Sequence, residues 1–318
     1  MKRALHSCAF LISLFLLSGC SSQQEDWQAF LDESFNKTEG AVRLLQRQIN
    51  SGSLRNTQLL NHYADVVRAQ KPEMSGIVDA LTLDTTTAGP IFQGLKSRLN
   101  DAKTALQSAP GKGESAVQEV WSELELIRTA ANPDIYAMML TDPINVLADM
   151  SEGQLARVEA MSKEASLQAN RSADTGPGSQ LVGNPNYGHW RTDSSGSSFW
   201  EWYGKYALFS TLFHRPVYYN SWASGRNYSY YHDYGRSHYT SPSQFKSQTN
   251  VNNQAKSKFQ KTGQSFQSPY AQTKTGAART VKTPQAKPTS NNFKSRYQSS
   301  SSARDAARRT SRSSSGGK

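Results

Sequence analysis

The sequence predicts an all-α fold, in which a compact multi-helix domain precedes an aromatic amphipathic segment and a disordered basic tail. Three observations lead to this prediction. Apolar residues recur at helical spacing over residues 25–170, and long alternating runs are missing there. Residues 21–170 are acidic, with 20 Asp and Glu against 13 Lys and Arg. Residues 241–318, by contrast, hold one acid, 15 bases and almost no aliphatic side chains.

The N-terminal residues have the features of an export signal. Lys2 and Arg3 give a positive start, and an apolar run follows from Ala4 to Leu17. As a helix this run is about 21 Å long, whereas the hydrocarbon core of a bilayer is about 30 Å thick. The pattern is typical of a secretory signal peptide, which is removed after export.

The apolar run ends in Leu17-Ser18-Gly19-Cys20, which resembles the lipobox of bacterial lipoproteins. The resemblance implies that residues 1–19 are a lipoprotein signal peptide and that Cys20 is the lipidation site, carrying diacylglycerol and an acyl chain such as palmitate. Residues 20–24 then form a lipidated tether. Two or three acyl chains anchor a protein durably in a membrane. An ordinary signal peptide with a chance cysteine is the alternative interpretation.

The residue after the cysteine bears on the location. Ser21 follows Cys20 where an aspartate would favour the inner membrane, so the resemblance implies the outer membrane of a diderm host. We therefore expect an envelope protein that faces the periplasm or the cell surface. Cys8 lies in the discarded segment, so the mature chain has no cysteine pair for a disulfide.

The acidic α-helical domain is predicted over residues 25–170 from apolar stripes and their start and stop signals. A stripe beginning at Trp27 stops at Gly52, and further helices are predicted over residues 53–71, 73–83, 91–110 and 117–131. Asn132-Pro133 and Asp142-Pro143 each fit an N-cap with proline in the first turn. Ser151 has capping-box spacing to Gln154, ahead of a last helix. We expect about five to seven helices around one core.

The next two segments differ from the helical domain in composition. Residues 171–198 are rich in Gly, Ser, Pro and Asn, which predicts a linker. In the aromatic-rich segment 199–240, five rings are spaced 3, 4, 3 and 4 residues apart, which predicts a short amphipathic helix with all five on one side. These docking candidates are Phe199, Trp202, Tyr206, Phe209 and Phe213. The stripe could pack in the core or on a second copy, lie on a membrane surface, or dock on a partner.

Residues 241–318 are predicted to be a disordered, basic, low-complexity tail, because they cannot bury enough apolar surface to offset the entropy of ordering. Bases interleaved with single aromatic residues are typical of a polyanion-binding segment. The predicted polyanion-binding residues are Lys246, Lys256, Lys258, Lys261, Arg279, Lys282, Lys294, Arg296, Arg308, Arg309 and Arg312.

No catalytic motif is present in the sequence. It contains no Gly-x-Ser-x-Gly, Walker loop, Gly-x-Gly-x-x-Gly or His-Glu-x-x-His. His232, Asp233 and His238 could share a metal ion, but their spacing matches no zinc signature. We therefore predict no catalytic residue, no metal, no cofactor and no small-molecule substrate; a hydrolase is the enzymatic alternative.

The predicted function is a non-enzymatic, membrane-anchored envelope lipoprotein that binds or scaffolds. Its basic tail would contact an anionic polymer such as peptidoglycan, lipopolysaccharide or extracellular DNA. The first alternative is an accessory subunit that docks on another envelope protein through the helical domain and the aromatic stripe. In a second alternative the basic tail is attracted to the acidic domain of its own chain.

Overall fold

The computed structural model describes residues 2–160, 162, 164, 176–213, 215–224, 229–263, 266 and 268–270, with side chains from residue 23 onward. These residues all belong to one unit, Met1–Ala286, while a second unit, Lys287–Lys318, lies outside the described part. The described chain is mostly helical, which confirms the broad fold class. Within it, no helix combines the length and apolar character needed to cross a bilayer.

The N-terminal half consists of seven α-helices in the described residues, joined by short 3₁₀ turns. They are α1 (Lys2–Asn50), α2 (Thr57–Gln70), α3 (Ser75–Thr82), α4 (Pro90–Leu106), α5 (Glu114–Ala130), α6 (Pro133–Met139) and α7 (Thr141–Met150), with 3₁₀ turns at Pro72–Met74, Leu83–Thr85 and Pro110–Lys112. Most of the predicted helix ends are confirmed. α1 stops before Gly52, whose φ of 64° lies in the left-handed region, where glycine costs least.

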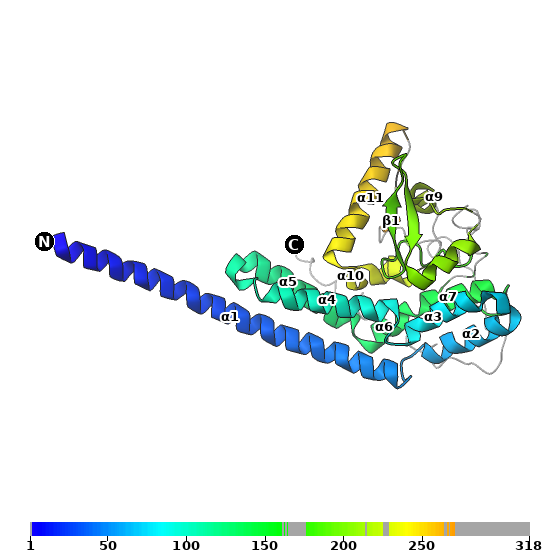
Figure 1. The fold of residues 1–318 in the computed structure, drawn as a ribbon, viewed down its shortest axis with the longest axis horizontal. Helices are drawn as coiled ribbons and strands as arrows, with labels where there is room; N and C mark the ends of the chain where they lie inside the picture. The colour runs from blue at the N-terminus through cyan, green and yellow to red at the C-terminus, as the bar shows by residue number, and fades with distance from the viewer. Residues whose placement is uncertain are drawn as a thin grey trace, which may run out of the picture. The chain divides into compact units, whose positions relative to one another are not determined.

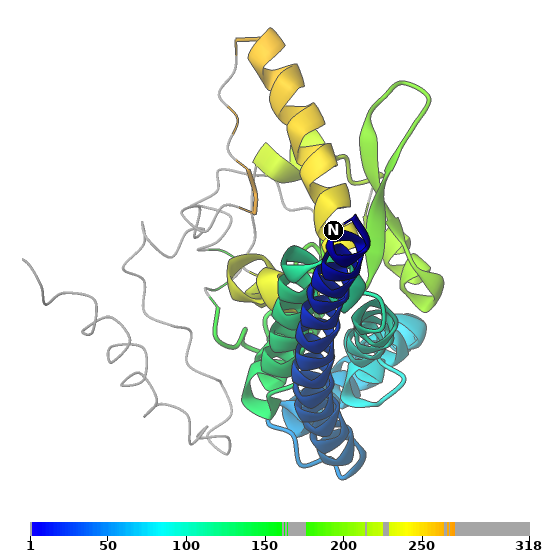
Figure 2. The same ribbon diagram turned by 90° about the vertical axis from the view of Figure 1, so that its left-hand side faces the viewer.

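Helix α1 packs through a regular apolar seam. Its buried positions alternate in spacing by four and three residues: Leu31, Phe35, Thr38, Val42, Leu45 and Ile49. This spacing keeps one face of the helix against its neighbours, as in a coiled coil. Figures 1 and 2 show α1 running beside α4 and α5. The polar member of the seam, Thr38, donates its hydroxyl to the carbonyl of Ser34 at 2.9 Å and lies 3.3 Å from that of Leu124.

The C-terminal segment contains a two-stranded sheet and several short helices. Its elements are β1 (Gly188–Thr192), β2 (Ser198–Trp202), the 3₁₀ helix η4 (Gly204–Leu212), α9 (Tyr219–Ser224), the π-helical turn η5 (Tyr231–Gly235), α10 (Arg236–Tyr239) and α11 (Pro242–Lys261). The strands are antiparallel, with Trp190 opposite Trp200 and His189 opposite Glu201. Both figures show α11 beside this hairpin.

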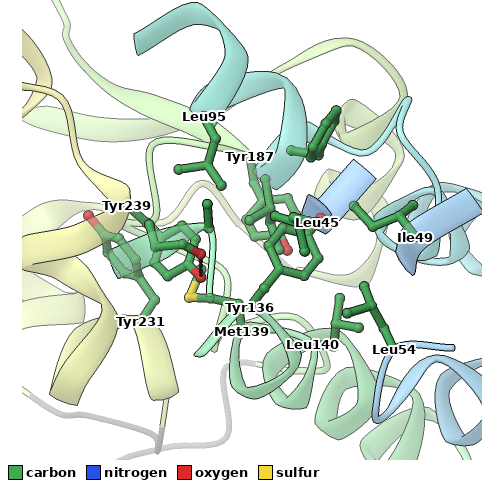
Figure 3. Close-up of a cluster of buried hydrophobic side chains, with 14 of the residues drawn as sticks. Leu45, Ile49, Leu54, Leu95, Tyr136, Met139, Leu140, Tyr187, Tyr231 and Tyr239 are labelled. Carbon is green, nitrogen blue, oxygen red and sulfur yellow. Dashed lines mark hydrogen bonds between the residues drawn. The ribbon is translucent and has the colours of Figure 1, made fainter. Parts of the chain in front are cut away.

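Tyrosines attach the C-terminal segment to the helical half. Tyr187, Tyr206 and Tyr239 bury their rings in the main core. Each donates its hydroxyl at 2.8 Å to the helical half, to Oδ2 of Asp84 and to the carbonyls of Ala80 and Ala130 respectively. Figure 3 shows Tyr187, Tyr231 and Tyr239 in one cluster with side chains of α1, α4 and α6. One continuous core therefore joins the two halves.

A second, smaller core lies under the hairpin. It is built mainly of aromatic rings, and its buried members are Val182, Trp190, Trp200, Tyr219, Ala223, Val251, Ala255 and Tyr270. Trp190 makes edge contacts with Trp200 at 5.1 Å and with Tyr219 at 4.8 Å between ring centroids. Tyr270 closes this core, because its hydroxyl accepts a hydrogen bond from Nε1 of Trp190 at 3.2 Å.

Three of the sequence predictions for the C-terminal half are wrong. The predicted linker, 171–198, contains strand β1, and its residues Leu181, Val182 and Tyr187 are fully buried. The predicted amphipathic helix over residues 199–213 is instead strand β2 followed by a 3₁₀ helix. The predicted disordered tail begins with the 20-residue helix α11. The rest of that tail, beyond Tyr270, lies outside the described residues.

Two predicted helix starts in the first half are also wrong. Residues 151–160 form turns and bends, and the Ser151 hydroxyl accepts a hydrogen bond from the Leu155 amide at 2.9 Å without starting a helix. Asn145 holds this stretch instead, through both backbone groups of Val158. Helix α7 begins at Thr141, so Asp142 is not its N-cap. The Asn132 cap is confirmed, since its side chain accepts from the amides of Asp134 and Ile135.

Candidate polyanion interface

Helix α11 has strong local reasons to form. Ser241 is its N-cap and makes a full capping box with Gln244: the Ser241 hydroxyl accepts from the Gln244 amide at 3.2 Å, and the Gln244 side chain accepts from the Ser241 amide at 2.9 Å. Pro242 occupies the first turn, where its missing N–H is harmless. Lys258 and Lys261 lie in the last turn, where positive charge is favourable for the helix dipole.

One face of α11 is buried against the rest of the C-terminal segment through Gln248, Val251 and Ala255. Gln248 is only 4% exposed, yet all of its polar atoms have partners. Its Nε2 donates to the Gly183 carbonyl at 3.1 Å and to the Tyr231 hydroxyl at 2.9 Å, and its Oε1 accepts from Nε of Arg236 at 2.7 Å. A buried amide satisfied in this way fixes the rotation of the helix about its axis.

The exposed side of α11, away from these buried residues, carries Lys246, Lys256 and Lys261, and we call it the lysine face; Lys258 lies two positions from Lys256, beside the buried side. Lys246, Lys256, Lys258 and Lys261 are all exposed, and α11 contains no acidic residue. Lys258 donates to the carbonyl of Gly196 in the hairpin turn at 2.7 Å. Among the described residues, no carboxylate forms an ion pair with any of these four lysines. The result is a positively charged surface on a helix of fixed orientation.

Arg236 packs between two aromatic rings beside α11. Its guanidinium lies 4.1 Å from the ring centroid of Phe245 and 4.2 Å from that of Tyr270. These cation–π contacts and the hydrogen bond to Gln248 occupy the Arg236 guanidinium, a planar group that in other settings binds anions through two parallel hydrogen bonds. Sequence reasoning missed Arg236 and Gln248, because their partners are distant in sequence or reached only by folding.

The described structure places four of the eleven predicted polyanion-binding residues, the lysines of α11. The other seven lie outside the described residues: Arg279, Lys282, Lys294, Arg296, Arg308, Arg309 and Arg312. Cys20, the predicted lipidation site, lies within the backbone of α1, and its side chain is not described.

The five predicted docking rings do not share a face. Phe199 and Trp202 lie three positions apart on strand β2 and therefore point to opposite faces of the hairpin. Tyr206 and Phe209 are buried in the main core, at 5% and 0% exposed. Phe213 is half-buried and stacks on Trp202 at 5.9 Å. The predicted aromatic stripe is therefore replaced by core packing.

Other rings are exposed on the outer face of the hairpin. Tyr203 and Tyr218 are 44% and 39% exposed. Tyr203 stacks on the His189 ring at 5.2 Å, and Tyr218 lies 6.3 Å from Phe199. Between them, Glu201 accepts from Arg191 at 2.8 Å and contacts Nε2 of His189 at 3.1 Å. We call His189, Arg191, Phe199, Glu201, Tyr203 and Tyr218 the outer hairpin face.

Two buried carboxyl groups of the helical half hold the C-terminal segment. Asp84 accepts the Tyr187 hydroxyl, and Asp142 accepts from the Ser229 hydroxyl at 2.9 Å and from the Tyr230 and Tyr231 amides at 2.7 and 3.0 Å. Burial raises the pKa of both carboxyls to about 7, although these hydrogen bonds favour the ionised form. Asp142 thus caps the segment that leads into α11 rather than its own helix.

The histidines considered as metal ligands do not form a metal site in the described residues. His232 is buried among rings, with Trp222 at 5.3 Å and Tyr270 at 5.9 Å between centroids. The backbone carbonyl of His238 accepts from Arg98, whose guanidinium also pairs with Glu123. No group of three His, Cys, Asp or Glu side chains in the described part of the chain could hold a metal ion.

The chain was compared with known proteins at the levels of family, sequence and fold. No protein-family model, no curated protein and no solved structure matches it.

Proposed function

We propose that this protein is a non-enzymatic, lipid-anchored binding or scaffolding protein of a bacterial envelope, whose basic C-terminal part contacts an anionic polymer. The observation that carries the proposal is the exposed, acid-free lysine face of α11. A cationic surface held in a fixed orientation loses less conformational entropy on binding than a free tail does. Peptidoglycan, lipopolysaccharide and extracellular DNA are the polymers with the required charge.

The anchor part of the proposal is supported by the lipobox-like sequence that ends at Cys20. Cells fed with labelled palmitate should incorporate the label into the wild-type chain and not into Cys20→Ala. Membrane fractionation should then place the labelled chain in the outer membrane. Label entering the Cys20→Ala chain would overturn the anchor.

The binding part is tested with the full chain and two triple variants. Lys246→Gln, Lys256→Gln and Lys261→Gln remove three charges from α11. Lys37→Gln, Lys96→Gln and Lys112→Gln remove three exposed lysines from the helical half and serve as the matched control. Co-sedimentation with purified sacculi, and binding to lipopolysaccharide and DNA, are measured over a range of salt concentrations.

We expect the α11 variant to bind more weakly and with a shallower salt dependence, because fewer counterions are released. The control should bind like the wild type. If both variants bind equally well, the lysines of α11 do not contact the polymer. This result would contradict the proposal that α11 forms the binding surface.

A second candidate function is docking on an envelope protein, and the outer hairpin face favours it. Exposed Tyr rings beside Arg, such as Tyr203 and Tyr218 near Arg191, are enriched at protein interfaces. Crosslinking in cells should recover the same partner with the wild type and with the α11 lysine variant, and lose it in Tyr203→Ala/Tyr218→Ala. A partner retained by the tyrosine variant would exclude docking through this face.

A further inference from the structure

The lysine face of α11 also carries a row of uncharged polar side chains. Lys246, Asn250, Asn253, Ser257 and Gln260 are spaced 4, 3, 4 and 3 residues apart, and all five are exposed. At 3.6 residues per turn, residues with this spacing lie one above another on a single side of the helix. The row is about 21 Å long, with Lys256 and Lys261 beside it.

The amides of this row are available to a ligand. In the described part of the chain, the side chains of Asn250, Asn253 and Gln260 form no hydrogen bond, whereas the neighbouring Asn252 accepts one from the Tyr219 hydroxyl at 3.1 Å. An amide side chain offers two donors and one acceptor oxygen. Neutral groups that donate and accept match the hydroxyl groups of a sugar, and the adjacent lysines match its acidic substituents.

The same surface offers few free aromatic rings to a single-stranded nucleic acid. Binding of single strands relies on aromatic platforms for base stacking, and the rings nearest the row are already engaged. The guanidinium of Arg236 lies against one face of the Phe245 ring, which is 45% exposed, Phe259 contacts Phe266 at 5.1 Å, and Tyr270 is 7% exposed. The guanidinium of Arg236 contacts two rings and Gln248, so it is not directed at a ligand lying on the row.

We propose that the Asn250–Asn253–Gln260 row of α11 is a binding track for the sugar units of an anionic polysaccharide, whose carboxylates pair with Lys246, Lys256 and Lys261. This inference rests on the proposed function and narrows its polymer to an acidic glycan. The lysines supply attraction to any polyanion, and the amides supply the preference for sugar.

The test compares three full-length proteins on three probes. The probes are polygalacturonate, inorganic polyphosphate and single-stranded DNA of matched charge number, at one fixed salt concentration. The row variant is Asn250→Ala/Asn253→Ala. Its matched control, Asn61→Ala/Asn100→Ala, removes two exposed asparagines from α2 and α4. The α11 lysine variant is the third protein.

We expect the row variant to lose about tenfold in affinity for polygalacturonate, and to bind polyphosphate and DNA within twofold of the control. Equal affinity of row variant and control for polygalacturonate would overturn the track, as would an equal loss on all three probes. If the lysine variant loses affinity for every probe while the row variant loses none, the track fails and the proposed function stands. If the lysine variant loses nothing, both fail.

Discussion

The helical half and the C-terminal segment bury their surfaces by different chemistry. The core of α1–α7 is mainly aliphatic, with Leu, Ile, Val and Ala at helical spacing. Half of the buried residues in the smaller core under the hairpin are Trp or Tyr, and the segment is attached through tyrosine hydroxyls and buried carboxyls. A buried hydroxyl or carboxyl must meet its hydrogen-bond partner, because an unpaired buried polar group costs free energy, so each of these contacts fixes one geometry. The C-terminal segment is therefore held by a few specific contacts.

This difference suggests a division of roles. The helical half, whose helices follow from local apolar spacing, supports the C-terminal segment. That segment orients α11 through contacts of Gln248, Tyr231 and Asp142. A stable presentation of the lysine face depends on that chain of contacts. The two regions should therefore respond differently to substitution and to pH.

The largest effect is expected at the junction. Tyr231→Ala removes a fully buried ring whose hydroxyl bonds to Thr240 at 2.7 Å and to Gln248. We expect a loss of about 3–5 kcal/mol in the free energy of unfolding, measured by urea denaturation. Tyr234, three residues along, is 55% exposed, and Tyr234→Ala should change stability by less than about 0.5 kcal/mol. Equal losses in the two variants would contradict the core assignment of Tyr231.

A smaller and more local effect is expected from Gln248→Leu. This change leaves the Tyr231 hydroxyl, the Gly183 carbonyl and Arg236 without their shared partner, at a cost of about 2 kcal/mol. Hydrogen exchange should speed up in α11 and stay unchanged in α4 and α5. The exposed Gln254 on the same helix supplies the control, Gln254→Leu. Loss of protection in α4 would mean that the two regions unfold together.

The two buried carboxyls make the stability of the fold depend on pH. Burial raises the pKa of Asp84 and Asp142 to about 7 in the folded chain, against about 3.9 when unfolded. The folded state then binds these protons more tightly, so the free energy of unfolding should rise as pH falls from about 7 to about 4. The gain should reach at least about 1 kcal/mol. Glu33, Glu152 and Asp193, whose pKa values are lowered by hydrogen bonds, act in the opposite sense below about pH 4.

Urea denaturation at pH 7, 6 and 5 measures this dependence, and Asp142→Asn is the informative variant. Removing one of the two carboxyls should make the free energy of unfolding depend less steeply on pH, whatever stability the variant loses at pH 7. A wild-type chain that becomes less stable between pH 7 and pH 5 would show that these carboxyls remain ionised in the folded state.

The smallest effect is expected on the outer hairpin face. Tyr203→Ala and Tyr218→Ala remove exposed rings, so thermal unfolding should indicate changes within about 0.5 kcal/mol for each. A larger loss would make these rings part of the hairpin core and would weaken their assignment to partner docking.

Local sequence signals predicted much of the helical half. The α1 stripe, the stop at Gly52 and the Asn132 cap each depend on residues a few positions apart, and the structure confirms them. Local signals gave wrong predictions where the hydrogen-bond partner of a residue is distant in the sequence. Ser151 and Asp142 both have the spacing of helix caps, but Ser151 starts no helix and Asp142 caps backbone amides at Tyr230 and Tyr231, 88 and 89 residues away.

The candidate site shows the same limit. The lysines of α11 were predicted to bind polyanions from composition alone, and that role stays a prediction. Three of them, Lys246, Lys256 and Lys261, lie on one exposed side because Gln248, Val251 and Ala255 are buried on the other, which composition does not reveal. The predicted docking rings were misplaced, because a 3-4 spacing of aromatic residues also fits a strand followed by a tight helix.

The sequence by itself determined the separation of an acidic half from a basic C-terminal part, and the helices whose apolar stripes and caps are local. Only the tertiary structure decided that residues 198–202 pair with β1, that α11 is ordered against the aromatic core, and that two carboxyls of the helical half are buried beneath the C-terminal segment. The physical reason is that strand pairing, aromatic packing and burial of charge depend on partners brought together by folding, whereas helix periodicity is encoded within a few turns.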